Sequence, residues 1–363
     1  MNLGYFMMPN HPPHRRYADA HAHNLDTLEF IDGMGYSEAW VGEHYTCKRE
    51  PLSCPDILIA QAFVKTKQIR LGAGAFLLPY HLPAELAHRI MWLDHISGGR
   101  FMVGIGAGGL PTDCDLFGVD GAAGENRDMM VEAFDLMVKF WTSDGPFQHV
   151  GHYYKGGRPA GMPEMGLAYH MEPLTKPYPD IAIAGLSESS PTLRFAGLRG
   201  FLPMSLAWSP DYLVSHWKAF QEGAEASGKP ADRSRWRIGV EMYVAETDAE
   251  ARRNAINGSM GESWNNYMLP LLAKLGVIGA CKHDQSVPDS DVTVEYLVDN
   301  VWAVGSPRTV AEKLAKLRDK VGDFGTLLHV GYDHLEEMTS YRESLTALKT
   351  EVLPSLAIGA KAA

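Results

Sequence analysis

The strongest constraint on the fold is a regular alternation of short apolar segments with longer segments of helical period. Eight segments have the composition of buried strands: Leu3–Met8, Glu38–Gly42, Ile69–Leu77, Phe101–Ile105, Ile181–Ala184, Leu202–Leu206, Trp236–Val244 and Thr326–Val330. Such alternation is typical of βαβ units that form a parallel sheet. Because the strands number eight and are too apolar to face water, we expect a closed (β/α)8 barrel. An open doubly wound sheet is the competing architecture.

The helical period marks the segments between these strands. They are Ala20–Met34, Ala84–Ile96, Asn126–Trp141, Thr192–Leu198, Pro210–Ser227, Asp248–Asn257, Thr309–Val321 and Tyr341–Glu351. Two stretches break the rhythm. Residues 142–179 predict an irregular insertion after the fourth βα unit, with a hairpin at Phe147–Tyr154 and the rest as a lid over the barrel mouth. Residues 258–291 predict a second irregular insertion, and 357–363 a frayed tail of a single domain spanning 1–363.

Composition excludes several classes of partner. The 33 Lys and Arg against 44 Asp and Glu give a formal charge of −11, which argues against nucleic acid and anionic membrane surfaces. We find no apolar run of bilayer length and no signal peptide at the start of the sequence. The four cysteines form no CxxC pair, which fits a reduced, cytoplasmic protein.

The pair Glu43-His44 directly follows the second predicted strand. In a barrel this position lies at the C-terminal face, where active sites occur. A histidine can exchange protons near neutral pH, and the adjacent carboxylate could orient it. The alternative is a loop histidine without chemistry, since the chain has 15 histidines.

Two glycine- or serine-rich segments could meet a ligand. Gly104–Gly109 matches GxGxxG, but we expect the next helix only about 15 residues later, so a glycine-rich strand end open to a flat ligand is the better interpretation. The alternative is a plain tight turn. The segment Gly185–Thr192, with Ser187, Ser189 and Ser190, runs from a strand into a helix and could hold a phosphate. Ordinary helix capping by Ser189 or Ser190 is the alternative.

The motif His21-Ala-His23 could indicate a metal-dependent barrel hydrolase, with Asp333 as a further ligand. It lies inside a predicted helix, where residues two apart do not share a face. We therefore predict no metal site.

Several blocks in fixed order resemble a known family. They are Gly4-Tyr-Phe-Met-Met-Pro9, Trp40-Val-Gly-Glu-His44, the segment from Ile69 to Pro83, the segment from Trp92 to Phe101 leading into Gly104-Ile-Gly-Ala-Gly, Pro179–Gly185 and Leu297–Ser306. In this order they resemble the bacterial luciferase-like, flavin-dependent monooxygenases, in the branch of limonene and diketocamphane monooxygenases.

The resemblance implies a usually dimeric (β/α)8 barrel that uses reduced FMN from a separate flavin reductase. It matches His44 to the active-site histidine, Gly74-Ala75 to a non-proline cis peptide under the flavin, and Ser187, Ser189 and Ser190, with Gly185, to the phosphate loop. Gly106 and Ala107 stand where luciferase proper has a cysteine and an arginine, so light emission is not expected.

The implied activity is oxygenation through a C4a-peroxyflavin of an apolar cyclic small molecule, by Baeyer–Villiger or epoxidation chemistry. The expected pocket contains Met7, Met8, Tyr45 and Trp208. An F420-dependent oxidoreductase of the same superfamily is one alternative. A non-catalytic flavin-binding protein and the metal-dependent hydrolase are the others.

Overall fold

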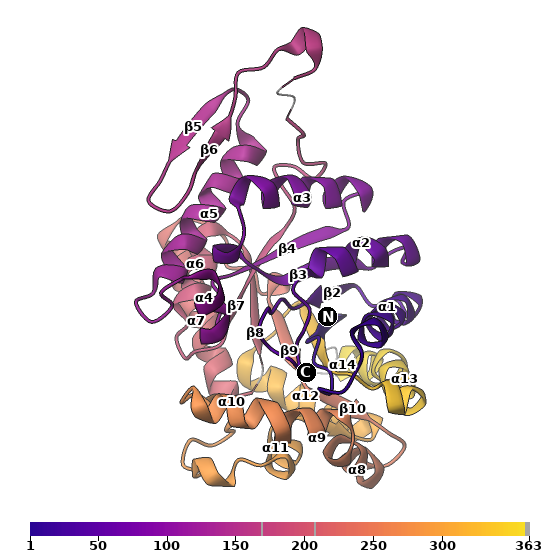
Figure 1. The fold of residues 1–363 in the computed structure, drawn as a ribbon. Helices are drawn as coiled ribbons and strands as arrows, with labels where there is room; N and C mark the ends of the chain where they lie inside the picture. Colours follow the sequence, from indigo (N-terminus) through magenta and orange to yellow (C-terminus); the bar gives the residue numbers. More distant parts are fainter. Residues whose placement is uncertain (168–169, 207, 360–363) are drawn as a thin grey trace.

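The computed structural model describes residues 1–167, 170–206 and 208–359, with the backbone alone for 357–359. Eight parallel strands close into a barrel surrounded by helices, which confirms the predicted fold (Figure 1). Around the barrel the order is β1, β12, β9, β8, β7, β4, β3 and β2. The barrel strands are β1 (Asn2–Met7), β2 (Glu38–Val41), β3 (Arg70–Leu77), β4 (Phe101–Gly106), β7 (Ile181–Gly185), β8 (Leu202–Leu206), β9 (Arg237–Val240) and β12 (Thr326–Gly331).

The helices agree with the helical period where it was strong. They are α1 (Tyr17–Gly33), α2 (Pro55–Lys65), α3 (Pro83–Ile96), α4 (Pro111–Phe117), α5 (Glu125–Thr142), α6 (Pro191–Arg199), α7 (Pro210–Ala226), α8 (Asp248–Asn257), α9 (Ser259–Ser263), η4 (Trp264–Met268), α10 (Leu269–Lys274), α11 (Val294–Asn300), α12 (Pro307–Val321), α13 (Met338–Ala347), η8 (Leu348–Val352) and α14 (Leu353–Gly359). Helices α2, α4 and α11 were not anticipated. Helix α4 begins at Pro111, much sooner after Gly109 than the sequence suggested.

Residues 259–274 are helical, which corrects the expectation of an irregular stretch over 258–291. Helix α9, the π-helical turn η4 and α10 follow one another without a break. Four buried apolar side chains recur at a spacing of four residues in this segment, namely Met260, Trp264, Met268 and Leu272. That spacing places them on one face of the helix, and burying the face stabilises it.

The predicted strand Trp236–Val244 is two strands. Its first half is the barrel strand β9, and its second half, β10 (Met242–Val244), leaves the barrel to pair in parallel with β11 (Ala303–Gly305). Glu241 lies at the break, and its backbone carbonyl accepts a hydrogen bond from the N–H of Ala303. The break therefore directs the chain away from the end of β9.

Apolar side chains fill the barrel interior. Trp40, Met102, Met204 and Leu328 are among the buried residues that form this inner cluster. At the N-terminal end of the barrel, Arg237 of β9 makes a bidentate ion pair with Glu38 of β2, with both nitrogen–oxygen distances at 3.0 Å. The indole N–H of Trp40 donates to the same carboxylate at 2.8 Å.

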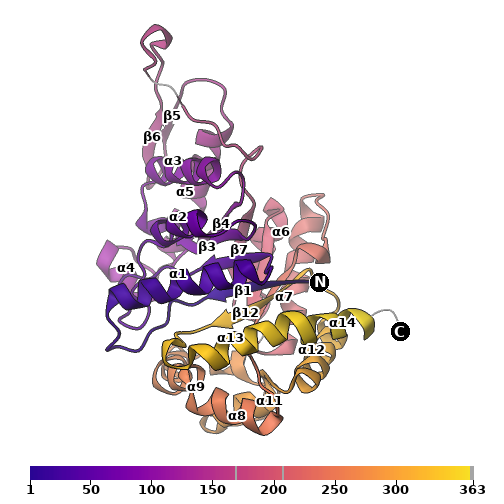
Figure 2. The same ribbon diagram turned by 90° about the vertical axis from the view of Figure 1, so that its right-hand side faces the viewer.

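The insertion at 142–179 projects away from the barrel. Strands β5 (Phe147–Val150) and β6 (Lys155–Arg158) form an antiparallel hairpin, so the expected hairpin is present but extends beyond Tyr154. Figures 1 and 2 show it beyond α3 and α5, at the top of both views, rather than across the barrel as a lid. Two carboxylates fix it there: Glu132 of α5 accepts three N–H groups of residues 152–154, and Asp94 of α3 accepts two donors of Thr175.

The structure also bears on the expected C-terminal tail and on membrane-spanning helices. The predicted tail at 357–363 begins within α14, and residues 360–363 lie outside the described part. Among the described helices, none combines the length and the apolar character needed to cross a bilayer.

Candidate functional site

The C-terminal mouth of the barrel is open to solvent. Most residues of the eight strands are buried, but Phe6, Gly74, Ala75, Gly106, Ala184 and Leu206, which lie in the C-terminal halves of their strands, are half-buried or exposed. Active sites of barrel enzymes lie at this face. The accessible side chains are small or apolar, so the opening suits a flat, weakly polar molecule.

The backbone of β3 and β4 is irregular and closely packed near the mouth. The Gly74–Ala75 peptide bond is cis, as the resemblance implied, and the pairing of β3 with β4 shifts register between Ala73 and Phe76. Gly104 permits this close packing, because a Cβ there would lie 2.2 Å from the carbonyl oxygen of Ala73. At Gly106 a Cβ would meet the side chain of Leu77 at 3.2 Å, so β4 packs closely against β3 there as well.

His44 stands at this mouth between two carboxylates. Its Nδ1 lies 3.3 Å from Oδ2 of Asp113 at the start of α4, and its Nε2 lies 3.5 Å from Oε2 of Glu50. The imidazole side chain is 26% exposed, whereas both carboxylates are buried. A ligand at the mouth can therefore reach the ring, while the carboxylates hold it in place.

The carboxylates favour the protonated form of His44. Burial alone would lower the pKa of His44, but the hydrogen bond to Asp113 and the charge of Glu50 outweigh it and raise this pKa above its ordinary value. Burial opposes ionisation of Asp113 as well. Its hydrogen bonds with His44 and Thr46 prevail and lower the pKa of Asp113 to about 2.

Glu43, the neighbour of His44, does not orient that ring. It is buried and accepts hydrogen bonds from the Tyr45 hydroxyl at 2.6 Å and from the backbone N–H of Leu77 at 3.1 Å. The Nε2 atom of His81 also lies 2.8 Å from Glu43. These contacts join the loop after β2 to the end of β3, so Glu43 supports the loop that carries His44.

The helical segment 259–274 covers the same loop. Tyr267 of η4 donates its hydroxyl to Glu50 at 2.9 Å, and Arg49 makes a bidentate ion pair with Glu262 at 2.7 and 2.9 Å. The desolvation of the Tyr267 phenol raises its pKa well above the ordinary value, so it remains a neutral donor. These contacts hold Glu50 beside His44.

A second buried carboxyl, Glu241, lies at the end of β9. Its Oε1 accepts hydrogen bonds from the indole of Trp208 and the hydroxyl of Tyr332, both at 3.2 Å, while Oε2 has no partner in the described structure. Burial raises the pKa of Glu241 to about 7. Trp264 of η4 in turn donates to Tyr332 at 2.7 Å. This cluster connects the ends of β8, β9 and β12.

The serine segment lies at the N-terminus of α6. Ser187 and Ser189 are exposed, and Ser189 has a positive φ of 50°. Ser190 is buried, and its hydroxyl caps the helix by accepting the N–H of Leu193. Gly185 is buried too, and it packs closely against α6, since a Cβ there would lie 2.6 Å from Leu193. The structure therefore presents Ser187 and Ser189 to a ligand, and uses Gly185 and Ser190 to seat the helix.

The four expected pocket residues have different surroundings. Met8 is half-buried beside the end of β1, but Met7 is 3% exposed and packs in the core between barrel and helices, since neighbouring strand residues face opposite sides. Tyr45 packs edge-on against Tyr80 and Phe117. Trp208 is buried and bonded to Glu241.

The histidines of the possible metal motif are separated. His21 is half-buried and contacts Gln61, whereas His23 is buried, and burial lowers its pKa to about 4. Asp333 instead pairs with His11 and Arg15, each at 2.8 Å. Within the described ranges, no three His, Cys, Asp or Glu side chains are grouped as metal ligands.

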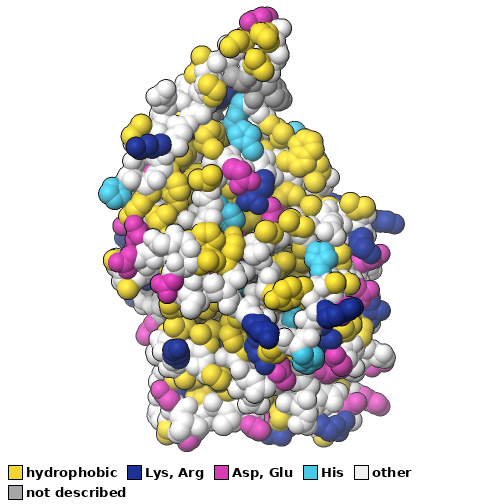
Figure 3. Space-filling view, viewed as in Figure 1, with side chains coloured by type: hydrophobic (Ala, Val, Ile, Leu, Met, Phe, Trp, Pro, Cys, Tyr) yellow, Lys and Arg dark blue, Asp and Glu magenta, His cyan; other side chains and the backbone are white. Residues whose placement is uncertain are grey.

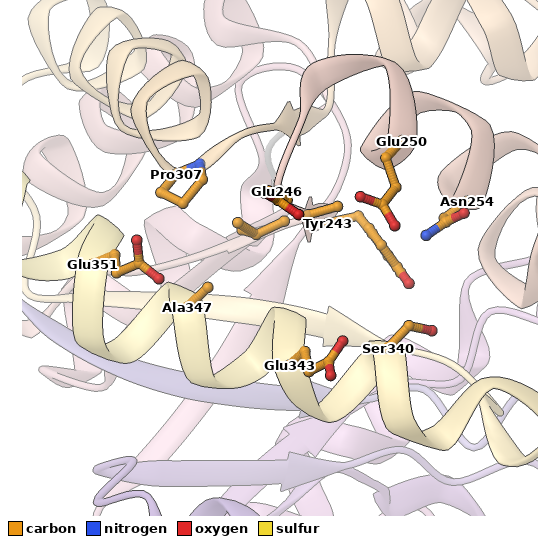
Figure 4. Close-up of a pocket in the computed structure, with 11 residues that line it drawn as sticks. Tyr243, Glu246, Glu250, Asn254, Pro307, Ser340, Glu343, Ala347 and Glu351 are labelled. Carbon is orange, nitrogen blue, oxygen red and sulfur yellow. The ribbon is translucent and has the colours of Figure 1, made fainter.

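A separate acidic hollow lies outside the barrel, between α8, β10 and α13 (Figure 4). Its volume is about 420 Å³, and four glutamates line it: Glu246, Glu250, Glu343 and Glu351. None of its lining residues is a histidine or a cysteine. It lies apart from the His44 site.

Sequence reasoning missed the partners of His44. Asp113 follows Pro111 at the start of α4, and Pro followed by an acidic residue in the first turn is a helix-start signal that could have revealed this helix. Glu241 is a lone acidic residue within an apolar run, which could also have been noticed. Glu50 carries no such signal, because a loop of eight residues separates it from β2.

Comparison with known proteins agrees with this architecture. The family described as "Luciferase-like monooxygenase" matches residues 1–323. The chain is 32% identical to 2,5-diketocamphane 1,2-monooxygenase 1 of Pseudomonas putida, covering 99% of this chain and all of that protein. It is 29% identical to limonene 1,2-monooxygenase of Rhodococcus erythropolis, covering 98% and 86%.

A solved structure gives the same answer. The chain matches the oxygenating constituent of 3,6-diketocamphane monooxygenase from Pseudomonas putida, a type II Baeyer–Villiger monooxygenase in complex with FMN. The TM-score is 0.92, with 33% identity and 98% coverage of both chains. The resemblance read from the motifs is thereby confirmed, and the chain belongs to the luciferase-like monooxygenase family of flavin-dependent enzymes.

Proposed function

We propose that this protein is the oxygenating component of a two-component monooxygenase, which uses reduced FMN and O2 to oxygenate an apolar cyclic small molecule. The single observation that carries the proposal is the placement of His44. It follows β2 at the C-terminal mouth of the barrel, between two buried carboxylates, and β2 pairs with β3, which carries the accessible Gly74–Ala75 backbone. Bound reduced flavin would supply the activation of O2.

The residues at the mouth fit a flavin. Gly74, Ala75, Gly106 and Ala107 are at least partly accessible and present little beyond backbone, so a planar ring system could lie against them. Ala184, exposed although it lies within a barrel strand, continues this opening toward α6. At the N-terminus of α6, the hydroxyls of Ser187 and Ser189 and the helix dipole could hold a phosphate.

His44 would act as the proton carrier. Its raised pKa keeps the imidazolium available around neutral pH, where it can donate a hydrogen bond to a developing oxyanion or to a substrate carbonyl. Asp113 fixes the ring through Nδ1, which leaves the Nε2 side for the reacting groups and Glu50. The role is therefore to hold and move one proton at Nε2.

The helical segment 259–274 would keep water out. It is joined to the His44 loop through Tyr267 and Glu50, and to β12 through Trp264 and Tyr332. A dry site prevents loss of oxidising equivalents as hydrogen peroxide. In this arrangement the shielding would come from 259–274 and not from the 142–179 insertion that the sequence favoured.

The proposed substrate class follows from the relatives and the mouth. The names of two relatives, a diketocamphane monooxygenase and a limonene monooxygenase, say that they act on such molecules. In this chain, the accessible side chains of Phe6, Met8 and Leu206 make the mouth apolar. Attack on a ketone would give a ring-expanded ester, and oxygen transfer to an alkene would give an epoxide. Both products are consistent with a proton held at His44.

The first test is anaerobic titration of the protein with reduced FMN, followed by addition of O2 with a panel of cyclic ketones and alkenes. The measured quantity is the ratio of oxygenated product to hydrogen peroxide for each reduced FMN consumed. We expect coupled product formation from the wild type and from His283→Ala, an exposed histidine as control. We expect His44→Ala to lose at least tenfold in product while still binding reduced FMN.

Full coupled product formation by His44→Ala would refute its role. Tight binding of reduced FMN without product from any substrate would favour a non-catalytic flavin-binding protein. Turnover with reduced F420 and without O2 would favour the oxidoreductase alternative.

We also propose a reductase and a second copy of the chain as partners. The solved relative is itself described as an oxygenating constituent, which supports delivery of reduced FMN by a separate reductase. On α2 and α3, Ile57, Val64, Trp92 and Ile96 are 49–89% exposed, and Figure 3 shows hydrophobic side chains over the upper part of this face. Burying such a surface in a homodimer would be favourable. Light scattering should give a dimeric mass that Trp92→Glu reduces.

A further inference from the structure

A side cavity of about 380 Å³ lies between α7, α12 and β11, on the outer side of β9. Its walls are largely apolar and include Trp208, Val240, Trp302, Leu314 and Leu317. This volume lies within the range of small-molecule sites, which are apolar with a few placed polar groups. The cavity is distinct from the barrel mouth, because His44 and the glycines of β3 and β4 do not line it.

The rim of this cavity is basic. Lys313, Lys316 and Lys320 lie at spacings of three and four residues, which places them on one face of α12 toward the cavity. The single acidic lining residue, Asp299, is already paired with Arg252 through two contacts at 2.8 and 3.0 Å. Lys320 pairs with Asp211 at 2.8 Å, but neither Lys313 nor Lys316 is in an ion pair in the described structure, so the rim retains an excess of positive charge.

Lys313, which lines the cavity, has no carboxylate among its hydrogen-bond partners in the described structure. Its half-buried ammonium donates only to the backbone carbonyls of Val298 and Trp302, at 3.0 and 3.1 Å. An ammonium has three N–H donors, so one remains for a further acceptor. Because Lys313 is a cation, the group that would complement it is an anionic acceptor.

We propose that this cavity binds a small amphipathic carboxylate, with the apolar body against Trp208, Trp302 and Leu317 and the carboxylate at the lysines of α12. The cavity volume limits the body to a short alkyl chain or a single ring. A neutral analogue lacks the charge that the lysines recognise, and an inorganic anion lacks the apolar body. Binding at this site does not depend on the proposed monooxygenase activity, whereas an effect of binding on catalysis rests on it.

A ligand bound in this cavity should affect the residues at the barrel mouth. Trp208 lines the cavity and also donates its indole N–H to Glu241 at the end of β9. A ligand packed against the Trp208 ring would restrict the same side chain that Glu241 holds. The carboxylate would therefore act on catalysis from outside the His44 site, through the position of the Trp208 side chain.

Isothermal titration calorimetry on the full chain tests the proposal, with octanoate, cyclohexanecarboxylate and 1-octanol as probes. We expect at least one carboxylate to bind at least tenfold more tightly than 1-octanol, and the preference between chain and ring identifies the body. The double variant Lys316→Gln/Lys320→Gln should weaken this binding at least fivefold. The matched double variant Lys65→Gln/Lys218→Gln removes two lysines elsewhere on the surface and should bind as the wild type does.

A third variant locates the site without touching charge. Val301→Phe adds volume at a half-buried wall of the cavity and should abolish carboxylate binding while Lys313, Lys316 and Lys320 remain. His44→Ala should leave binding unchanged. Equal affinity for octanoate and 1-octanol, wild-type binding by the Lys316/Lys320 double variant, or loss of binding in His44→Ala instead of Val301→Phe would each overturn the proposal.

Discussion

Replacing Asp113 by asparagine should destabilise the protein in a manner that depends on pH. The carboxylate is buried, and the fall of its pKa from 3.8 to about 2 corresponds to about 2.5 kcal/mol of favourable interaction with its charged form. Asparagine keeps the size of the side chain but loses the charge. At about 2 °C for each kcal/mol in a chain of this size, we expect a melting temperature about 5 °C lower near pH 6.

The sign of the pH dependence follows from both partners. The lowered pKa of Asp113 gives stability that is present above its unfolded pKa and is lost as the pH falls toward 2. The raised pKa of His44 gives stability that is complete below its unfolded pKa and is lost as the pH rises through the folded value. The difference between wild type and Asp113→Asn should therefore be greatest near pH 5–6 and shrink toward pH 9.

Thermal melts at pH 5, 6, 7, 8 and 9 measure this difference. Asp115→Asn is the matched control, since Asp115 is exposed on the same helix, and it should melt within about 1 °C of the wild type. The reasoning is refuted if Asp113→Asn melts like the control at pH 6, or if the gap between Asp113→Asn and wild type widens as the pH rises.

Three further substitutions test separate features. Glu241→Gln should raise the melting temperature at pH 8, because burial raises the pKa of Glu241 to about 7 and its ionisation costs stability as the pH rises from 4.5; melts at pH 4.5 should show no gain. Gly104→Ala should lower the melting temperature sharply or prevent soluble expression, since its Cβ would lie 2.2 Å from a backbone oxygen, whereas Gly109→Ala, with nothing within 4 Å, should not. Ser190→Ala removes the cap of α6 and should cost about 1 kcal/mol of unfolding free energy in denaturant titrations.

The barrel could be predicted because its strands are buried on both faces. Such strands are nearly continuous apolar runs, and all eight were located by that property. The boundary inside Trp236–Val244 could not be found, because β10 is also buried and apolar, and only the acidic residue Glu241 marks the break. Helix α2 was missed although Pro55 and Asp56 occupy its first turn, since the aliphatic residues that follow do not repeat with a clear helical period.

Only part of the site could be predicted from the sequence, and the reason is physical. His44 could be inferred because a strand end fixes its position, and strand ends are visible in the sequence. Asp113 lies 69 residues further along the chain, and Tyr267 meets Glu50 across 217 residues, so only the closed barrel brings these groups together. Met7 lies in the core and not in the expected pocket for a different reason. Adjacent residues of a strand face opposite sides, so a shift of one position moves a side chain from mouth to core.

The ion pair between Glu38 and Arg237 has a consequence for assembly of the chain. It links β2 to β9 across 199 residues, and both side chains are nearly inaccessible in the finished barrel. Removing one member of such a buried pair costs about 3–5 kcal/mol, because the other charge is left uncompensated. A fragment that stops before β9 would carry this penalty at Glu38 in addition to two open sheet edges. Fragments of this protein that lack β9 should therefore not persist as folded units, and the chain should reach its closed form only once β9 is in place.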